Sequence, residues 1–373
     1  MQLNDLKVTI AKHRAEGDSE RKLSLEVTEA FKQQNAFNIA TPLRLGGLAM
    51  PLPNALNLLC EVATQDAAAS WVIWNATLVS LYSRYMPTSL TAELFGRKQL
   101  AFCQSTIPAG TLNYDDDTAI VAGRWPLVSG SPGADWAILT CREFRAGSAV
   151  LDDHGNEKTT LVAVHCSDFN IIDTWNASGL RASGSDDLEV LDVTIEPHQI
   201  FAMDTAPHTL EAIDFVPIFP TLTAGFAAQT LGVSQSVLAA TFDHAQENER
   251  FSARQDLQLA IEKHDTAVET ATRALQHAAE QVWNSASTCS PVPNDQAVSL
   301  YAAAYLAIDA ATAAVNTLQS LWGTAGLYVD APIEKRVRDI NAMSRHIVAQ
   351  PEMRADVGRA KMGLVPNWPL FYV

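Results

Sequence analysis

The sequence predicts an α+β protein that is mostly α, with an N-terminal helical domain (residues 1–100), a central β domain (101–205) and a C-terminal helical bundle (206–373). Three observations predict this order. Apolar residues recur at helical spacing over the first hundred residues. Short runs rich in β-forming residues then follow, and long apolar helical patterns begin after residue 217.

The N-terminal helices are predicted from their apolar spacing. Residues 23–37 place Leu25, Ala30 and Phe31 among charged side chains, as in a helix with one buried face. Prolines and an asparagine at residues 51–54 begin a second helix. A third, more apolar helix is expected over residues 66–85.

The central domain is predicted from four short β-rich runs, at residues 119–121, 136–139, 160–164 and 188–195. Turn residues such as Pro132-Gly133 separate them. This spacing, without helices between the strands, is typical of a small antiparallel barrel or sandwich rather than of βαβ units. The acidic run Asp115-Asp116-Asp117 could attract a cation, but we expect a solvated turn there.

Three long helical patterns follow, over residues 222–244, 257–285 and 294–322. In the last of these, Asp309 is the only charged residue between Asp295 and Asp330. A helix that is apolar nearly all round must be buried on most sides. We therefore expect it at the centre of a bundle that also serves as a subunit interface.

Composition argues against several functions. A formal net charge of −16 disfavours nucleic acid and anionic membranes as partners, because their binding depends on clustered Lys and Arg. The five cysteines are dispersed and lack the spacing of a metal site, so we expect reduced core residues and no metal. Neither a signal peptide nor an uninterrupted apolar span of about 18 residues is apparent. These features predict a cytoplasmic protein.

A first cluster of chemically useful groups lies at residues 123–131. It places the Trp125 ring, serine hydroxyls and free backbone N–H groups at the end of a strand. Such an edge can bind a planar ring and its heteroatoms. An ordinary Ser/Gly turn is the alternative.

A second cluster comprises residues 334–339 and His346. If the segment is helical, Arg338 and Arg345 lie within about two turns of the histidine. Neighbouring cations would lower its pKa and favour a neutral imidazole that can act as a base near pH 7. A structural histidine at a helix end is the alternative.

Four stretches in this order carry a resemblance to a known family: Pro42-Leu43-Arg44-Leu45-Gly46-Gly47 with residues 66–71, Gly123-x-Trp125-x-x-x-Ser129-Gly130, Gly179-Leu180-Arg181-x-Ser183-Gly184-Ser185-x-Asp187, and residues 332–339 with His346. The chain resembles the acyl-CoA dehydrogenase superfamily over nearly its whole length, most of all its two-component flavin monooxygenase branch. Where several dehydrogenases carry a glutamate base, this chain has Ile347, and His346 stands at the position of the monooxygenase histidine. The resemblance implies a C-terminal four-helix bundle and a homotetramer.

The resemblance also implies a set of site residues. The cofactor would contact Gln104, Ser105, Trp125, Val128, Ser129, Gly323 and Arg338. His346 would deprotonate the substrate or steady the oxygenated flavin, and Ser185 would line the same cavity.

FMN is favoured over FAD as the reduced flavin. Residues 249–252 match poorly the Arg-x-x-Phe-Gly motif that binds FAD in related dehydrogenases, and the turn at residues 323–326 departs from their Gly-Gly-x-Gly. Because no nicotinamide site is visible, the resemblance implies a partner flavin reductase. Two alternatives stay open: an FAD-dependent acyl-CoA dehydrogenase-like oxidoreductase, and a catalytically silent flavin-binding protein.

Overall fold

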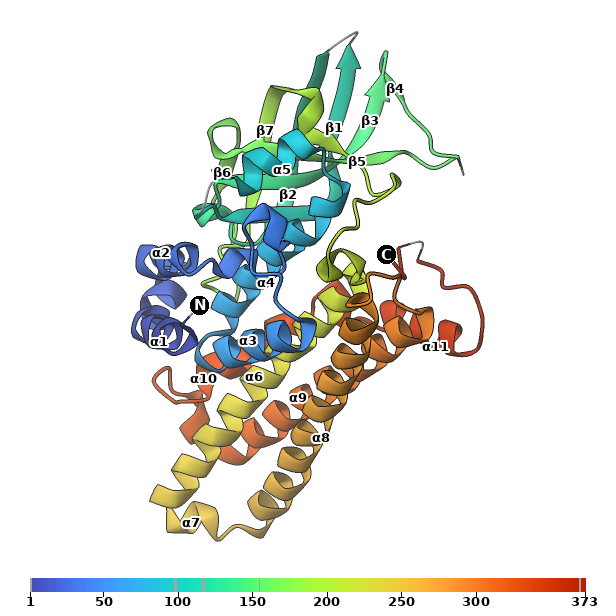
Figure 1. Ribbon diagram of the computed structural model, residues 1–373. Helices are drawn as coiled ribbons and strands as arrows, with labels where there is room; N and C mark the ends of the chain where they lie inside the picture. Colours follow the sequence, from blue (N-terminus) through green and yellow to red (C-terminus); the bar gives the residue numbers. More distant parts are fainter. Residues whose placement is uncertain (1, 97–98, 116–117, 154, 369) are drawn as a thin grey trace.

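The computed structural model describes residues 2–96, 99–115, 118–153, 155–368 and 370–373, so Asp116 and Asp117 of the expected acidic turn lie outside the described residues. Figure 1 shows the strands gathered at one end of the molecule and the long helices at the other, with the N-terminal helices beside their junction. This arrangement confirms the predicted fold class.

The N-terminal part contains α1 (Leu3–Glu20), α2 (Leu25–Gln33), α3 (Leu52–Gln65), α4 (Ala67–Tyr82) and α5 (Thr88–Phe95). Ser24 caps α2, and Asp66 caps α4 by accepting hydrogen bonds from two N–H groups of its first turn. The helix expected over residues 23–37 ends early, because Asn35 adopts a left-handed conformation. Helix α4 is buried on nearly every side, so it forms the wall between the other two parts.

The strands are β1 (Phe102–Asp115), β2 (Thr118–Val128), β3 (Trp136–Arg145), β4 (Ser148–Ala149), β5 (Thr159–His165), β6 (Asn170–Ile172), β7 (Asp186–Ile195) and β8 (Ile200–Phe201). They form one sheet in the order β6-β7-β2-β1-β3-β5-β8, with β4 paired to β3. The expectation of a purely antiparallel sheet is wrong in one pairing, since β1 and β3 run parallel. Because β1 and β2 are antiparallel, the end of β2 lies beside the start of β1.

The C-terminal part contains α6 (Ile218–Glu247), α7 (Glu249–Ser252), α8 (Gln255–Ala286), α9 (Asn294–Trp322), α10 (Glu334–Met343) and α11 (Pro351–Lys361). Helix α9 has the bounds expected from the sequence and packs against α6, α8 and α10. Its length and composition would suit a membrane span, but 61% of its most apolar window is buried, as in a core helix. One face of α9 is open in the single chain, where Leu306 is 49% exposed.

Candidate active site

A buried ionic cluster ties the three parts together. Lys335 Nζ of α10 lies 3.2 Å from Asp66 Oδ1 and 2.7 Å from Asp339 Oδ2. Asp66 is the cap of α4, and Asp339 Oδ1 also accepts a hydrogen bond from the Leu180 N–H at 2.7 Å. The start of α4, the helix α10 and the turn before β7 are therefore held in one arrangement.

Arg338 of α10 makes a second set of ionic contacts beside this cluster. Its guanidinium contacts Asp18 of α1 at 3.0 Å and Glu334 at 2.7 Å, and it donates to the Ser178 carbonyl at 2.8 Å. These partners pair the cation within the chain, and the contact of Arg338 with a flavin stays a prediction. Residue 179 is a glycine because its backbone lies against α10. A Cβ at Gly179 would lie 2.0 Å from the Arg338 carbonyl oxygen.

The buried ionic cluster holds the elements that carry a buried chain of hydrogen bonds. Trp71, one turn into α4, donates its indole N–H to Ser129 Oγ at 2.9 Å. Ser129 Oγ is 2.8 Å from Ser185 Oγ, which is 2.7 Å from Ser183 Oγ. Two residues that the sequence predicted for the site, Ser129 and Ser185, are thus brought together. Trp71 and Ser183 lie within the matched motifs, but no sequence pattern assigned either residue a role.

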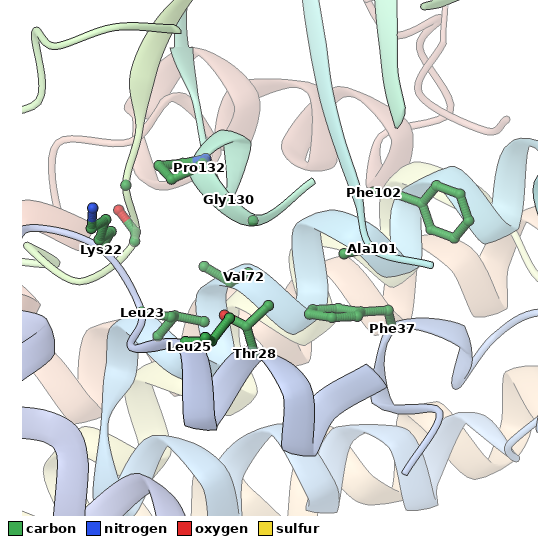
Figure 2. Close-up of a pocket in the computed structure, with 13 residues that line it drawn as sticks. Lys22, Leu23, Leu25, Thr28, Phe37, Val72, Ala101, Phe102, Gly130 and Pro132 are labelled. Carbon is green, nitrogen blue, oxygen red and sulfur yellow. The ribbon is translucent and has the colours of Figure 1, made fainter. Parts of the chain in front are cut away.

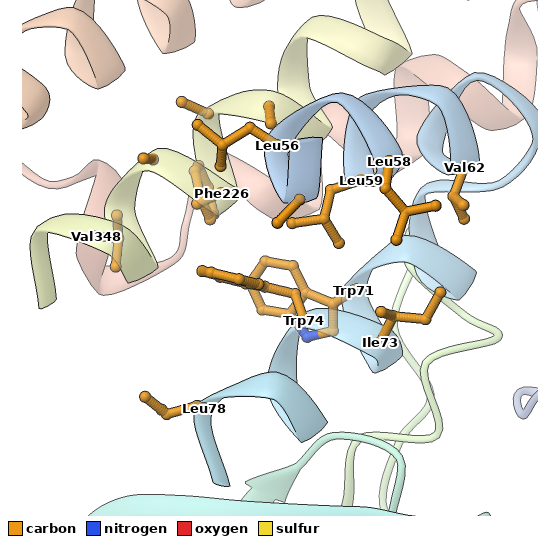
Figure 3. Close-up of a cluster of buried hydrophobic side chains, with 14 of the residues drawn as sticks. Leu56, Leu58, Leu59, Val62, Trp71, Ile73, Trp74, Leu78, Phe226 and Val348 are labelled. Carbon is orange, nitrogen blue, oxygen red and sulfur yellow. The ribbon is translucent and has the colours of Figure 1, made fainter. Parts of the chain in front are cut away.

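His346 also contacts Trp71. Its ring is 5.0 Å from the Trp71 ring, edge to face, and 5.6 Å from Phe226 of α6, nearly parallel to it. Figure 3 shows Trp71, Trp74 and Phe226 gathered with Val348 in one apolar cluster. No sequence pattern pointed to Phe226, because its helix is buried on most sides and offers no marked face.

Burial lowers the pKa of His346 to about 4, so the imidazole is neutral at pH 7. The expected direction is right, but the expected cause is wrong: α10 ends at Met343, and Arg338 is paired elsewhere. His346 Nδ1 accepts a hydrogen bond from the Val348 N–H at 3.3 Å. This bond places the imidazole hydrogen on Nε2, so His346 presents a hydrogen-bond donor in this arrangement. Its role as a base stays a prediction.

Gln104 and Asn75 form a polar edge next to this cluster. Gln104 Nε2 donates to Asn75 Oδ1 at 3.3 Å, and Asn75 Nδ2 donates to the Trp71 carbonyl at 2.8 Å. Gln104 Oε1 is buried and has no hydrogen-bond partner among the described residues. Asn75 could have been found from the sequence, since it lies four residues after Trp71 and so on the same helix face.

These groups fit the polar edge of a flavin ring. The ring presents N–H donors and carbonyl acceptors, and an unpartnered buried amide oxygen is suited to accept from such an N–H. Ser129 supplies a hydroxyl close by. Ser105, on the same strand as Gln104, is buried, and its Oγ accepts a hydrogen bond from the Ile107 N–H.

Trp125 is a correction to the expected site. Its ring is fully buried inside the sheet's own core and donates its indole N–H to the Thr140 carbonyl at 2.7 Å. A Cβ at Gly110 would lie 2.0 Å from the ring, which shows how closely the sheet encloses it. Val128 belongs to the same core, so neither side chain can lie against a flavin.

Gly323 is not brought to the rest of the site within one chain. It follows α9, where Trp322 stacks on His244 of α6. Phe226, which contacts His346, lies 18 residues earlier on α6, or about 27 Å along a helix. Within one chain, Gly323 is therefore remote from the His346 ring.

A cavity of about 220 Å³ lies beneath the 130–133 turn (Figure 2). Its lining is largely apolar, with Leu23, Phe37, Val72 and Phe102, and includes Ser183. Lys22 is the charged residue among those that line it.

The chain was compared with known proteins. A family model described as acyl-CoA dehydrogenase, C-terminal domain, matches residues 224–351. Indole-3-acetate monooxygenase from Pseudomonas putida is 25% identical over 89% of this chain and 85% of its own. The oxygenase component of p-hydroxyphenylacetate 3-hydroxylase from Acinetobacter baumannii is 23% identical over 96% of this chain and 87% of its own.

Solved structures share the fold. XiaF from Streptomyces sp., in complex with FADH2 and glycerol, matches with a TM-score of 0.88 and 21% identity, covering 98% of this chain and 95% of that one. FMN-bound TdsC from Paenibacillus sp. A11-2 matches with a TM-score of 0.83 and 15% identity, covering 100% and 98%.

Proposed function

We propose that this chain, a member of the acyl-CoA dehydrogenase superfamily, is the oxygenase component of a two-component flavin-dependent monooxygenase. The observation that carries the proposal is the neutral, half-buried His346 packed against Trp71, whose indole is hydrogen-bonded to Ser129. Its relatives in the comparisons are named monooxygenases and hydroxylases, which favours this function over an acyl-CoA dehydrogenase.

In the proposed mechanism, bound reduced flavin supplies the two electrons with which O2 is activated. Gln104 and Ser129 hold the polar edge of the ring, and Asn75 orients the Gln104 amide. His346 donates a hydrogen bond from Nε2 to an oxygen atom in the site, where charge develops. The surrounding aromatic side chains, Trp71 and Phe226, exclude water and so limit the loss of oxidising equivalents as peroxide.

Reduced FMN or FAD would come from a separate reductase, and we retain FMN as the preferred form. This preference rests on the poor match of residues 249–252 and 323–326 to FAD-binding motifs. The similar solved structures hold FADH2 in one case and FMN in another. Anaerobic titration should give reduced FMN an affinity at least equal to that of reduced FAD. A tenfold advantage for FAD, about 1.4 kcal/mol, would reverse the preference.

A cytoplasmic homotetramer is the assembly we propose. The open face of α9 and the exposed Leu327 and Tyr328 beyond it are apolar surface that a second copy would cover. A neighbouring copy could also bring its Gly323 to the flavin.

The function can be tested with a purified flavin reductase, NADH and O2. Indole-3-acetate and 4-hydroxyphenylacetate serve as probe substrates, because the relatives' names supply them. We expect an oxygenated product only when reductase, flavin and O2 are all present. Oxidation of an acyl-CoA by the protein with bound flavin and an artificial electron acceptor, without O2, would support the dehydrogenase alternative instead.

A further inference from the structure

The serine chain connects the candidate active site to the cavity. Ser129, Ser185 and Ser183 follow one another at 2.8 and 2.7 Å, and all three side chains are buried. Trp71 closes one end of the chain with its indole N–H. At the other end, Ser183 is 1% exposed and lines the cavity.

The three serine hydroxyls carry one more proton than their two mutual hydrogen bonds use. An indole N–H can only donate, whereas a hydroxyl donates one hydrogen bond and can accept two. Three hydroxyl protons therefore serve two serine–serine bonds, and one proton is left over. Depending on which hydroxyls donate, the spare proton resides on Ser129, on Ser185 or on Ser183. When Ser129 gives up its spare proton, one proton moves along each bond and a new one enters at Ser183 from the cavity, so all three serines end neutral with the spare proton on Ser183.

The cavity can supply that proton. Its volume of about 220 Å³ has room for several water molecules, each of which occupies about 30 Å³ in the liquid. Lys22, which is exposed, lies at its edge, so the cavity communicates with solvent (Figure 2). Among the hydrogen bonds of the described residues, Ser183 Oγ is engaged by Ser185 alone, which leaves it able to bond a water in the cavity.

We propose that Ser183 and Ser185 relay a proton between this cavity and Ser129. The proposal rests on the proposed monooxygenase function. When reduced flavin binds as its N1 anion, the anion, O2, a substrate C–H and one proton give oxidised flavin, a substrate C–OH and one water. The O–O bond and one substrate C–H bond break, one C–O bond forms, and O2 takes two electrons from the flavin and two from the substrate. The relay delivers the single proton that this balance takes up.

The protein without flavin provides the first test. With tryptophan labelled by ¹⁵N, the indole N–H signal of Trp71 is assigned by its loss in Trp71→Phe. Ser183→Ala should shift this signal, because Ser185 loses one of its two hydroxyl partners, which alters its bond to Ser129 and so the bond that Trp71 makes. The control is Ser131→Ala. Ser131 is also buried, but its hydroxyl donates to the Gly184 carbonyl at 3.4 Å and takes no part in the serine hydrogen bonds. This variant should leave the signal in place.

Turnover provides the second test. Ser183→Ala and Ser185→Ala should lower product formation at least about tenfold, less than the loss of a primary acid or base, because the relay acts through Ser129. Flavin affinity and melting temperature should stay at wild-type values. Ser185→Thr, which keeps a hydroxyl, should restore the rate, and a small buffer acid should partly rescue Ser183→Ala.

Two results would overturn the relay in an active enzyme: Ser183→Ala behaving like Ser131→Ala in both tests, or a loss of turnover matched by an equal loss of flavin affinity or melting temperature. The second result would identify a structural tie instead. A wild-type protein that makes no oxygenated product would overturn the proposed function, and the relay with it.

Discussion

At the scale of single residues, the chemistry centres on which nitrogen of His346 carries the hydrogen. Nδ1 accepts from the Val348 N–H, so Nε2 is the donor. The two possible roles of His346, base or hydrogen-bond donor, lead to different expected turnover in the same pair of variants.

His346→Gln keeps a side-chain N–H donor but cannot take up a proton, whereas His346→Leu removes both abilities. We expect His346→Leu to lower turnover about 100-fold, the usual scale for losing one donor at a developing charge. His346→Gln should retain at least about a tenth of wild-type turnover. Product and peroxide are measured with a coupled reductase; an equal, large loss in both variants would show that His346 is a base.

The lowered pKa of His346 also links stability to pH. The pKa is about 4 in the folded protein and about 6.5 in the unfolded chain, so the unfolded chain binds the extra proton between these values. The stability due to the neutral imidazole is complete above pH 6.5 and is lost as the pH falls toward 4. Between pH 7 and 4, the free energy of unfolding should fall by about 3 kcal/mol more in the wild type than in His346→Gln. Parallel urea titrations of the two proteins measure this, and identical pH profiles would contradict the burial of the imidazole.

At the scale of elements, the site depends on how the turn before β7 docks on α10. Leu180 donates to Asp339, and the Gly179 backbone lies against the Arg338 carbonyl. This docking holds Ser183 and Ser185 in line with Ser129.

Gly179→Ala should destabilise the protein by about 1–3 kcal/mol, because its Cβ would meet backbone that cannot move without displacing α10. Gly358 of α11 is the control, since a Cβ there has nothing within 4 Å and alanine favours a helix. Urea unfolding of both variants is the measurement. Equal stability of Gly179→Ala and the wild type would show that the turn docks less closely than described.

Helices were more predictable from the sequence than the sheet. The bounds of α9 follow from its uninterrupted apolar pattern between Pro293 and Gly323. Both β1 and its parallel pairing with β3 were missed. None of the four predicted runs covers residues 102–115, and local patterns do not identify the partners of a strand. Trp125 was misplaced for a related reason: the face of a strand that points into the sheet's core depends on register, which the motif does not reveal.

The candidate site was only partly predictable. Ser129, Ser185 and His346 follow from motifs whose order along the chain matches a family, and the structure brings all three around Trp71. Phe226 required the tertiary packing of α6, which no local pattern contains. The domain limits near residues 100 and 205 stay predictions.

At the scale of the whole molecule, the single chain leaves apolar surface uncovered. Gly323 lies far from His346, and Leu306, Leu327 and Tyr328 are exposed. We expect light scattering to give about four times the chain mass of 40.4 kDa at micromolar concentration. Leu306→Glu, on the open face of α9, should weaken the assembly. Leu259→Glu, on the exposed side of α8, is the matched control and should leave the assembly intact. A stable wild-type monomer would contradict the proposed assembly.

The central claim, that this protein inserts one atom of O2 into an organic substrate, is tested most directly with ¹⁸O2. Reduced flavin, a probe substrate and the protein are mixed with ¹⁸O2 in unlabelled water, and the molecular mass of the product is measured by mass spectrometry. We predict a product heavier by one ¹⁸O atom and the other atom recovered as labelled water. A dehydrogenated product without added oxygen, or peroxide as the only fate of ¹⁸O2, would contradict the claim.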